Sequence, residues 1–299
     1  MTGRRSGAWS VLAMFLGLVC GLPAGAAEYL GDDLCVECHE DQVNKLKSNP
    51  HGKFANSPGF LADQNCEGCH GPGSDHALQD GAPGTIASLT PGSDGQEVLN
   101  GLCLQCHQDS GRQHWQGAAH DAAGVVCTSC HLVHEKDPMR QRDGQAEACY
   151  QCHADIRAKA YRPYGHPLRH HQVVCSECHN SHGGTGPHEL DAFSVNDNCY
   201  TCHAEKRGPF LYEHFPVAED CTVCHDVHGS IHRGSLSRRA PFLCIECHQE
   251  QAGGNHVRQV YDYQPTNDFV ARGVLAQSCM NCHSQVHGTN HPSGRALMR

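Results

Sequence analysis

Ten cysteine pairs of the form Cys-x-x-Cys, each followed at once by a histidine, stand out in this sequence of 299 residues. Two thiols at this spacing can form thioether bonds to the vinyl groups of a porphyrin, and the adjacent histidine then supplies an axial nitrogen to the iron. Zinc knuckles and disulfides also use paired cysteines, but neither requires a histidine at the fifth position. With 26 histidines in the chain, ten such placements exclude chance. The pattern predicts ten covalently bound haem c groups.

The predicted haem ligands follow from the motifs, which we number one to ten in chain order. The thioether cysteines are Cys35, Cys38, Cys66, Cys69, Cys103, Cys106, Cys127, Cys130, Cys149, Cys152, Cys175, Cys178, Cys199, Cys202, Cys221, Cys224, Cys244, Cys247, Cys279 and Cys282. The proximal ligands to iron are His39, His70, His107, His131, His153, His179, His203, His225, His248 and His283.

The remaining histidines recur in two alternating patterns. A histidine follows each even-numbered motif closely and each odd-numbered motif after a longer gap. The predicted distal ligands are His51, His76, His120, His134, His166, His182, His214, His228, His256 and His287. A histidine three residues after its own proximal histidine is badly placed to reach the other face of the same haem, so we expect it to bind a neighbouring iron. The sequence leaves open which distal histidine serves which haem.

Six further histidines, and almost no methionine, complete the set of possible ligands. We expect surface or supporting roles for His114, His170, His171, His188, His232 and His291. Beyond the first 27 residues the chain holds only Met139, Met280 and Met298, so methionine is a poor candidate. Paired histidine ligands predict low reduction potentials, and a full set of them leaves no open iron for a substrate.

The spacing of the motifs also predicts the fold class. One long-gap and one short-gap site form a dihaem unit that recurs five times, and stacked repeats give elongated arrays. About 27 residues per haem are too few for an ordinary hydrophobic core, so the porphyrins must supply much of the apolar mass. With 32 glycines and 15 prolines, the sequence predicts a loop-rich multihaem cytochrome with short α-helices and little or no β-structure.

The first 27 residues have the features of a cleaved signal peptide. Arg4 and Arg5 precede an apolar stretch over 8–22, and the small residues at 24–27 favour cleavage near Ala26 or Ala27. Export agrees with haem attachment outside the cytoplasm. No later apolar run approaches the roughly 18 residues of a membrane helix. The remaining chain carries a net charge of −12, which disfavours nucleic acid and suggests redox partners with basic patches.

The ten motifs, the segments CHNSHG and CHDVHG, and the ending SCMNCHSQVHGTNHPSG resemble the MtrA/DmsE family of periplasmic decahaem c-type cytochromes. The resemblance implies two pentahaem halves, over 28–159 and 160–299, that form a wire partly inside an outer-membrane β-barrel protein. It also implies a location in the periplasm in association with the outer membrane. A periplasmic or inner-membrane cytochrome would be the donor or acceptor at one end, with an extracellular multihaem cytochrome at the other. A wide Gly/Pro-rich stretch over 71–101 departs from the regular spacing.

Three functions follow as hypotheses. The favoured one is an electron-transfer conduit between the periplasm and the outer membrane or extracellular side. The second is a soluble periplasmic electron shuttle or store, which needs no barrel. The third, a multihaem reductase, expects an irregular motif or a missing distal ligand, and all ten motifs are regular. We therefore expect an electron carrier and not an enzyme. The segment 260–275 is a candidate contact surface, although we favour a role as a cover over the last haems. The direction of electron flow stays open.

Overall fold

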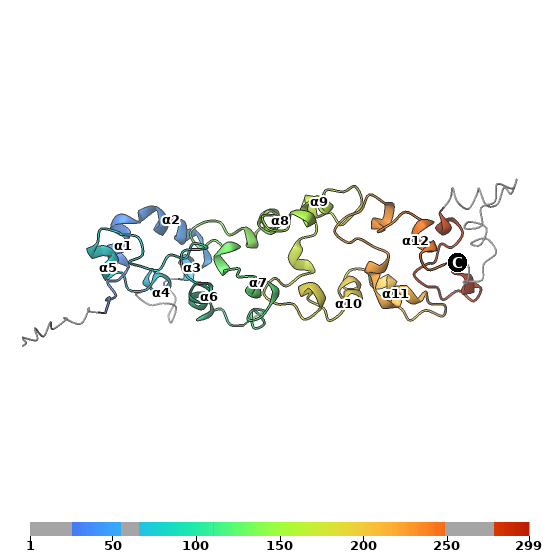
Figure 1. The fold of residues 1–299 in the computed structure, drawn as a ribbon, viewed down its shortest axis with the longest axis horizontal. Helices are drawn as coiled ribbons and strands as arrows, with labels where there is room; N and C mark the ends of the chain where they lie inside the picture. Colours follow the sequence, from blue (N-terminus) through green and yellow to red (C-terminus); the bar gives the residue numbers. More distant parts are fainter. Residues whose placement is uncertain (1–25, 55–65, 110, 249–277, 299) are drawn as a thin grey trace, which may run out of the picture.

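The chain forms an elongated body in which sequence order follows the long axis (Figure 1). The computed structural model describes residues 26–54, 66–109, 111–248 and 278–298. The signal-peptide prediction falls almost entirely outside these residues, as do His256 and the segment 260–275. In Figure 1 the colours pass from blue at one end to red at the other, so neighbouring repeats lie side by side. The predicted elongated array is confirmed.

Short helices and loops make up the described part of the chain, which contains no β-strand. Five isolated β-bridges are its only extended pairings. The α-helices are α1 (Asp32–Cys38), α2 (Glu40–Ser48), α3 (Pro50–Phe54), α4 (Glu67–His70), α5 (Ser74–Leu78), α6 (Gln96–Leu104), α7 (Ala119–Ala122), α8 (Arg142–Tyr150), α9 (Ala154–Ala160), α10 (Val195–Tyr200), α11 (Phe215–Glu219) and α12 (Phe242–Ile245). The 3-10 helices are η1 (Cys127–Ser129), η2 (Pro138–Arg140), η3 (Leu168–His170), η4 (Cys175–Glu177), η5 (Pro187–Glu189), η6 (Ala204–Lys206), η7 (Cys221–Val223), η8 (Arg233–Ser235), η10 (Cys279–Asn281) and η11 (Gly294–Ala296). The loop-rich fold class predicted from the sequence is confirmed.

The backbone alternates with the two kinds of haem motif. The odd-numbered motifs begin within the α-helices α1, α6, α8, α10 and α12. Four of the five even-numbered motifs instead begin at the 3-10 helices η1, η4, η7 and η10, and the other occupies α4. In both settings the histidine N–H donates to the carbonyl of the first cysteine, as His131 does to Cys127 at 3.0 Å. One helical turn thus presents both thiols and the histidine on one side.

The protein core is too small to organise a chain of this length. The largest buried cluster joins Ala146, Tyr150, Ala160 and Leu168, with Ile156 and Val173 packed against it. Only ten hydrophobic residues are buried in the part of the chain that the structure describes. This is far fewer than the core of a globular protein of this length needs.

Packing continues across the predicted boundary between the two halves at 159/160. The buried cluster spans it, because Ala146 lies before the boundary and Leu168 after it. Arg142 donates to Glu177 at 2.7 Å, and Lys159 pairs with Asp226 at 3.1 Å. The division into pentahaem halves stays a prediction, and these contacts join the repeats on either side of it.

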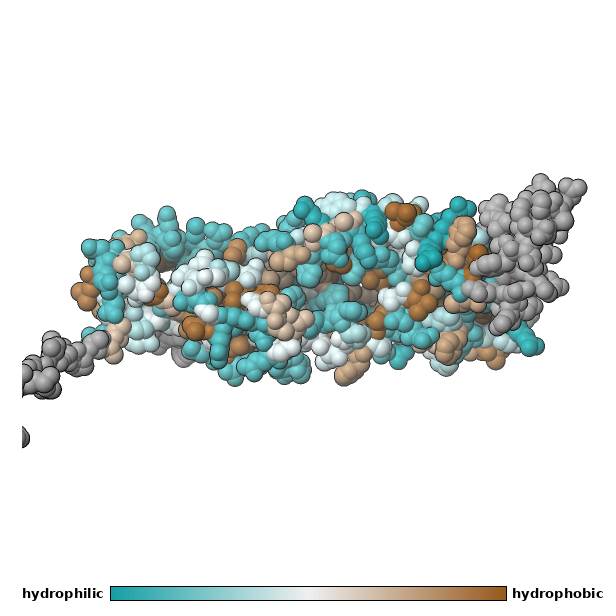
Figure 2. Space-filling view, viewed as in Figure 1, coloured by the Kyte–Doolittle hydropathy of each residue, from teal (hydrophilic) through white to brown (hydrophobic). Residues whose placement is uncertain are grey.

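The outer surface mixes hydrophilic and hydrophobic residues along its whole length (Figure 2). Several exposed apolar side chains belong to the haem motifs, among them Val36, Val223 and Met280 at 38%, 46% and 40% exposure. Within the described ranges, no helix is both long enough and apolar enough to cross a membrane.

Candidate haem-binding site

The two motifs of each predicted dihaem unit lie against each other through their first cysteines. The first cysteine of every odd-numbered motif lies beside the first cysteine of the following even-numbered motif. The pairs are Cys35 with Cys66, Cys103 with Cys127, Cys149 with Cys175, Cys199 with Cys221, and Cys244 with Cys279. All five dihaem units therefore have the same internal contact.

The second cysteine of the second, fourth, sixth and eighth motifs lies near the second cysteine of the following motif. These pairs are Cys69 with Cys106, Cys130 with Cys152, Cys178 with Cys202, and Cys224 with Cys247. Cysteine pairs within units and cysteine pairs between units therefore alternate from the first motif to the tenth. The haem attachment points thus form one row in sequence order.

Buried amide side chains hold the two motifs of a unit together. Asn100, three residues before Cys103, accepts the N–H of Cys127 at 2.9 Å. Asn196, three residues before Cys199, accepts the N–H of Cys221 at 2.8 Å. Asp32 stands at the equivalent position before Cys35 and accepts the N–H of Cys66 at 2.9 Å. Each of these side chains fixes the start of one motif against the helix of the other.

The structure brings nine of the ten proximal histidines next to a predicted distal histidine. The ring centroids of these pairs are 5.8 to 6.2 Å apart. The pairs, proximal residue first, are His39/His76, His70/His134, His107/His51, His131/His182, His153/His120, His179/His228, His203/His166, His225/His287 and His248/His214. The remaining predicted distal ligand, His256, lies outside the described residues.

None of these nine pairs joins a proximal histidine to the distal candidate that follows the same motif. The four described long-gap histidines reach forward by one odd-numbered site, as His120 after the third motif faces His153 of the fifth. The short-gap histidines after the fourth to tenth motifs reach back by one even-numbered site, as His182 after the sixth motif faces His131 of the fourth. His76 is the exception, because it follows the second motif and faces His39 of the first. Eight of the nine ring pairs thus tie two different dihaem units together.

The spacing of these rings suits one iron between them. A bond from a transition metal to an imidazole nitrogen is about 2 Å, so two bonds in line separate the nitrogens by about 4 Å, and the path from each nitrogen to its ring centre adds roughly 2 Å in total. The ring centroids of His131 and His182 are 5.9 Å apart, which matches this sum. The two rings are also nearly parallel, with an interplanar angle of 11°.

Hydrogen bonds at Nδ1 leave Nε2 of these rings available for a metal. His120, His166 and His214 donate through Nδ1 to the carbonyls of Ser181, Val227 and Val286, at 3.0, 2.9 and 3.0 Å. Each of these carbonyls directly precedes a short-gap distal histidine. The donor and the next histidine therefore hold each other in place, and the second ring nitrogen fixes ring orientation as at other metal sites.

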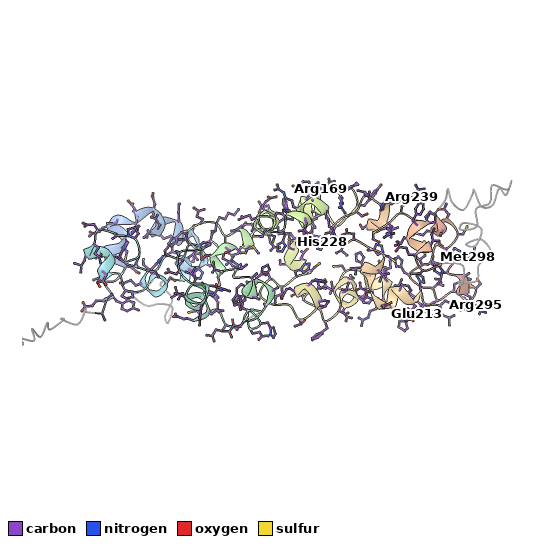
Figure 3. The ribbon with its side chains drawn as sticks, in the orientation of Figure 1. Arg169, Glu213, His228, Arg239, Arg295 and Met298 are labelled. Carbon is purple, nitrogen blue, oxygen red and sulfur yellow. The ribbon has the colours of Figure 1, made fainter. Side chains whose placement is uncertain are left out.

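Main-chain hydrogen bonds further hold the segments around His228 and His287 in place. Tyr164, two residues before His166, exchanges hydrogen bonds with Ser230, two residues after His228. Tyr212 and Thr289 form the equivalent bridge between His214 and His287. Figure 3 places His228 in the interior, between the upper and lower segments of the ribbon.

Glycine follows three of the short-gap histidines because the backbone passes close to an earlier segment there. Gly183, Gly229 and Gly288 have φ values of +111°, +139° and +112°, which side chains disfavour. A Cβ at Gly229 would meet the carbonyl of Lys159, and one at Gly183 would meet the carbonyl of His114. The segment HG in CHNSHG and CHDVHG is thus a close-packing requirement as well as a source of ligands.

Burial favours the neutral form of several distal candidates. Desolvation is the main cause that lowers the pKa of His51, His182, His214, His228 and His287. Neutral imidazole is the form that binds a metal, so these side chains are ready to ligate at neutral pH.

Polar groups left without protein partners gather near the motifs and fit a group with carboxylates at its edge. Buried atoms of this kind include Trp115 Nε1, Arg112 Nε and Tyr150 Oη. The indole of Trp115 lies 6.2 Å from the ring of His182, and Tyr150 is part of the fifth motif. Haem propionates are acceptors that such donors would satisfy. Together with the exposed apolar residues of the motifs, these donors show that the residues present fit haem.

The six other histidines do not form ring pairs with proximal histidines in the described part of the chain. His188 has a supporting role that the sequence did not reveal, because its carbonyl accepts from Nδ1 of His179 at 2.8 Å. His170 is exposed beside Arg169 Nε, 3.1 Å away, and His291 Nδ1 contacts Ser293.

Comparison with known proteins agrees with this arrangement. The doubled CXXCH motif family matches residues 120–158, 166–208 and 214–253. The multiheme cytochrome MtrA of Shewanella baltica is 41% identical over 279 residues, covering 90% of this chain and 81% of that protein. This chain belongs to the MtrA family of multihaem c-type cytochromes. The resemblance expected from the sequence is confirmed.

A second comparison is more distant. The C-type polyheme cytochrome OmcC of Geobacter sulfurreducens is 24% identical over 235 residues, which cover 69% of this chain and 28% of that protein. Both relatives are multihaem cytochromes by name. The family and the CXXCH motifs show that this chain binds haem c covalently and transfers electrons.

Proposed function

We propose that this chain binds ten haems and relays electrons along them, in sequence order, between the periplasm and the outer membrane or extracellular side. The supporting observation is the unbroken alternation of cysteine contacts along the long axis of the molecule. It gives every attachment point from the second motif to the ninth two neighbours, one within its dihaem unit and one in the next. A row of this kind has two ends and no branch, as a conduit requires.

The protein side chains have defined tasks in this function. The cysteines of each motif would hold the porphyrin edge, and the nine ring pairs together with His283 and His256 would supply axial nitrogens. When bound, haem supplies an iron that takes up and releases one electron. Paired histidines would hold the iron and would leave no position on it for a substrate. We infer an electron carrier and not a reductase for this reason.

The partner that we propose is an outer-membrane β-barrel protein around part of the elongated body. The similarity to MtrA over nearly the whole chain supports a role at the outer membrane. A barrel would shield the polar, loop-rich surface in Figure 2 from lipid, which such a surface cannot meet directly. A periplasmic or inner-membrane cytochrome would exchange electrons at one end of the row, and an extracellular multihaem cytochrome would do so at the other.

Purification from native outer membranes in mild detergent tests this proposal. The expected result is a stoichiometric complex of the cytochrome with a barrel protein. The complex should then carry electrons across vesicle membranes from an external reductant to an enclosed dye. Vesicles with the barrel alone are the control. Recovery of the cytochrome as a lone soluble protein, with no barrel at any step, would refute the conduit and leave the periplasmic shuttle.

A further inference from the structure

The proximal histidines of the five even-numbered motifs can be compared with one another, because the repeats give them the same setting. Each donates through Nδ1 to a residue further along the chain. In four of them the acceptor is a main-chain carbonyl. The bonds run from His70 to Ala87 at 2.8 Å, His179 to His188 at 2.8 Å, His225 to Gly234 at 2.8 Å, and His283 to Ala296 at 2.7 Å.

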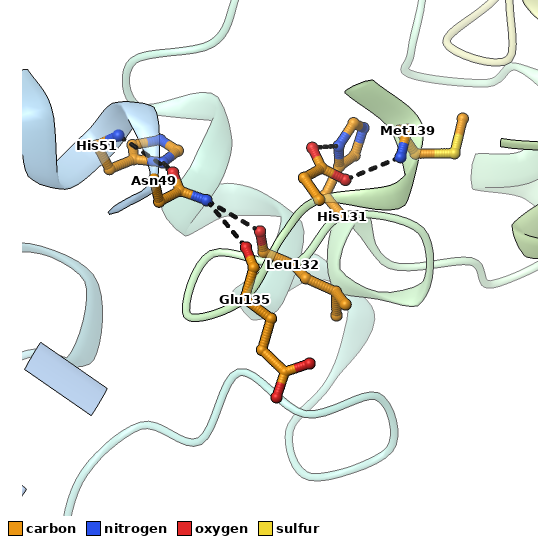
Figure 4. Close-up of polar contacts among 7 residues, drawn as sticks. Asn49, His51, His131, Leu132, Glu135 and Met139 are labelled. Atoms are coloured by element: carbon orange, nitrogen blue, oxygen red, sulfur yellow. Dashed lines mark hydrogen bonds and ion pairs between the residues drawn. The ribbon is translucent and has the colours of Figure 1, made fainter. Parts of the chain in front are cut away.

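The fourth motif departs from this pattern. His131 donates to a carboxylate oxygen, Oδ2 of Asp137, at 2.9 Å (Figure 4). The other four even-numbered sites therefore serve as references. Their proximal histidines donate to a neutral carbonyl, whereas His131 donates to a carboxylate.

The position of the Asp137 carboxylate is fixed. Its side chain is only 10% exposed, and Oδ1 accepts the N–H of Met139 at 3.1 Å, which caps the 3-10 helix η2. Helix η2 packs against α8, where a Cβ at Gly144 would touch Pro138. Among the described residues, no lysine or arginine forms an ion pair with Asp137. Its shortest hydrogen bond is the one from His131.

A carboxylate acceptor changes the electronic character of an axial histidine. Hydrogen bonds to a charged acceptor are roughly twice as strong as neutral ones. The stronger bond makes the imidazole a better electron donor, which stabilises ferric over ferrous iron and lowers the reduction potential.

We propose that Asp137 is a tuning residue that gives the haem of the fourth motif a lower reduction potential than the haems of the other even-numbered motifs. This inference rests on the proposed ligation of that iron by His131 and His182.

The test is redox titration of the fully loaded Asp137→Asn protein, followed spectroscopically. Asparagine keeps an acceptor oxygen of the same size and removes the charge. We expect one one-electron couple to move to higher potential by about a tenfold change in its equilibrium constant, or roughly 59 mV, with the others unmoved. Asp143→Asn is the matched control, because Asp143 is an exposed carboxylate on α8, near His131 in sequence.

Asp137→Glu should restore much of the lower potential, since it returns the charge. The inference is overturned when all haems stay low-spin in Asp137→Asn and no couple moves. It is also overturned when an iron becomes high-spin, because Asp137 would then hold the ligand in place instead of tuning it. Failure of the proposed ligation is distinguishable, since the wild-type protein would then already show a high-spin iron that binds carbon monoxide.

Discussion

Replacement of His182 by alanine tests the ligand pairing most directly. The ring of His182 lies 5.9 Å from that of His131, although the two residues belong to different motifs. Its neighbour His120 cannot substitute, because it faces His153 and its Nδ1 donates to Ser181. We therefore expect His182→Ala to open one iron and to leave the other nine paired.

The expected magnitude is one carbon monoxide bound per chain, against none in the wild-type protein. With ten motifs in the sequence, this corresponds to a high-spin signal from one tenth of the haem. Ferrous protein titrated with carbon monoxide gives the stoichiometry. His170→Ala is the control, because His170 is exposed and forms no ring pair with a proximal histidine in the described part of the chain. It should bind none.

The identity of the opened iron separates the pairing from its alternative. In His182→Ala, resonance Raman spectroscopy reports the iron–histidine stretch of the single five-coordinate site. If that site is the haem of the fourth motif, addition of Asp137→Asn lowers the frequency, because His131 loses its charged acceptor. A frequency unchanged by Asp137→Asn would place the open site elsewhere and refute the pairing of His182 with His131.

Three further predictions concern stability and acid sensitivity. Gly229→Ala should destabilise the protein by about 3 kcal/mol, because the φ of Gly229 is +139° and a Cβ there would meet the Lys159 carbonyl. Gly234→Ala is the control and should cost about 1 kcal/mol, because Gly234 has open space around it. Equal shifts in the denaturant midpoint of the two variants would contradict this prediction. Asn196→Leu should lower the free energy of unfolding by about 2 to 3 kcal/mol, because it removes the hydrogen bonds with Cys221 and with the Val217 carbonyl, the latter at 2.9 Å. Asn44 is exposed, so Asn44→Leu should be nearly neutral in the same denaturation assay. Burial alone would raise the pKa of Glu67, but hydrogen bonds from the N–H groups of Leu30, Gly31 and Gly73 outweigh burial and lower the pKa below the usual 4.5. The Glu67 carboxylate therefore stabilises the fold fully above pH 4.5, and this stabilisation is lost as pH falls through the pKa of Glu67 in the folded protein. Glu67→Gln should flatten that part of the stability profile, and an unchanged acid transition would show that Glu67 does not contribute to it.

The sequence predicted the features that depend on covalent spacing. The CxxCH motifs, the alternation of long and short gaps, and the expectation that a histidine such as His182 serves a neighbouring haem all follow from local geometry. The elongated, loop-rich fold followed from the shortage of residues per haem. These inferences needed only the chain itself.

The ligand partners could not be predicted, because they depend on where loops of unequal length return. Nothing in the residues around His51 indicates that its ring lies beside His107. Main-chain acceptors such as the carbonyls of Ser181 and Val227 cannot be predicted from the sequence, because every residue has a main-chain carbonyl whatever its side chain. The amides at Asn100 and Asn196 did leave one, since both stand three residues before the first cysteine of an odd-numbered motif.

The reach of the ligands across repeats also constrains how the molecule is assembled. On the proposed pairing, the second haem waits for His134, 64 residues after His70, and the fourth waits for His182, 51 residues after His131. A chain that emerges N-terminus first would therefore carry irons with one vacant face until the following repeat arrives. Each later repeat supplies the distal ligand for the even-numbered haem of the repeat before it, so a chain truncated between repeats should end in a haem with one vacant face.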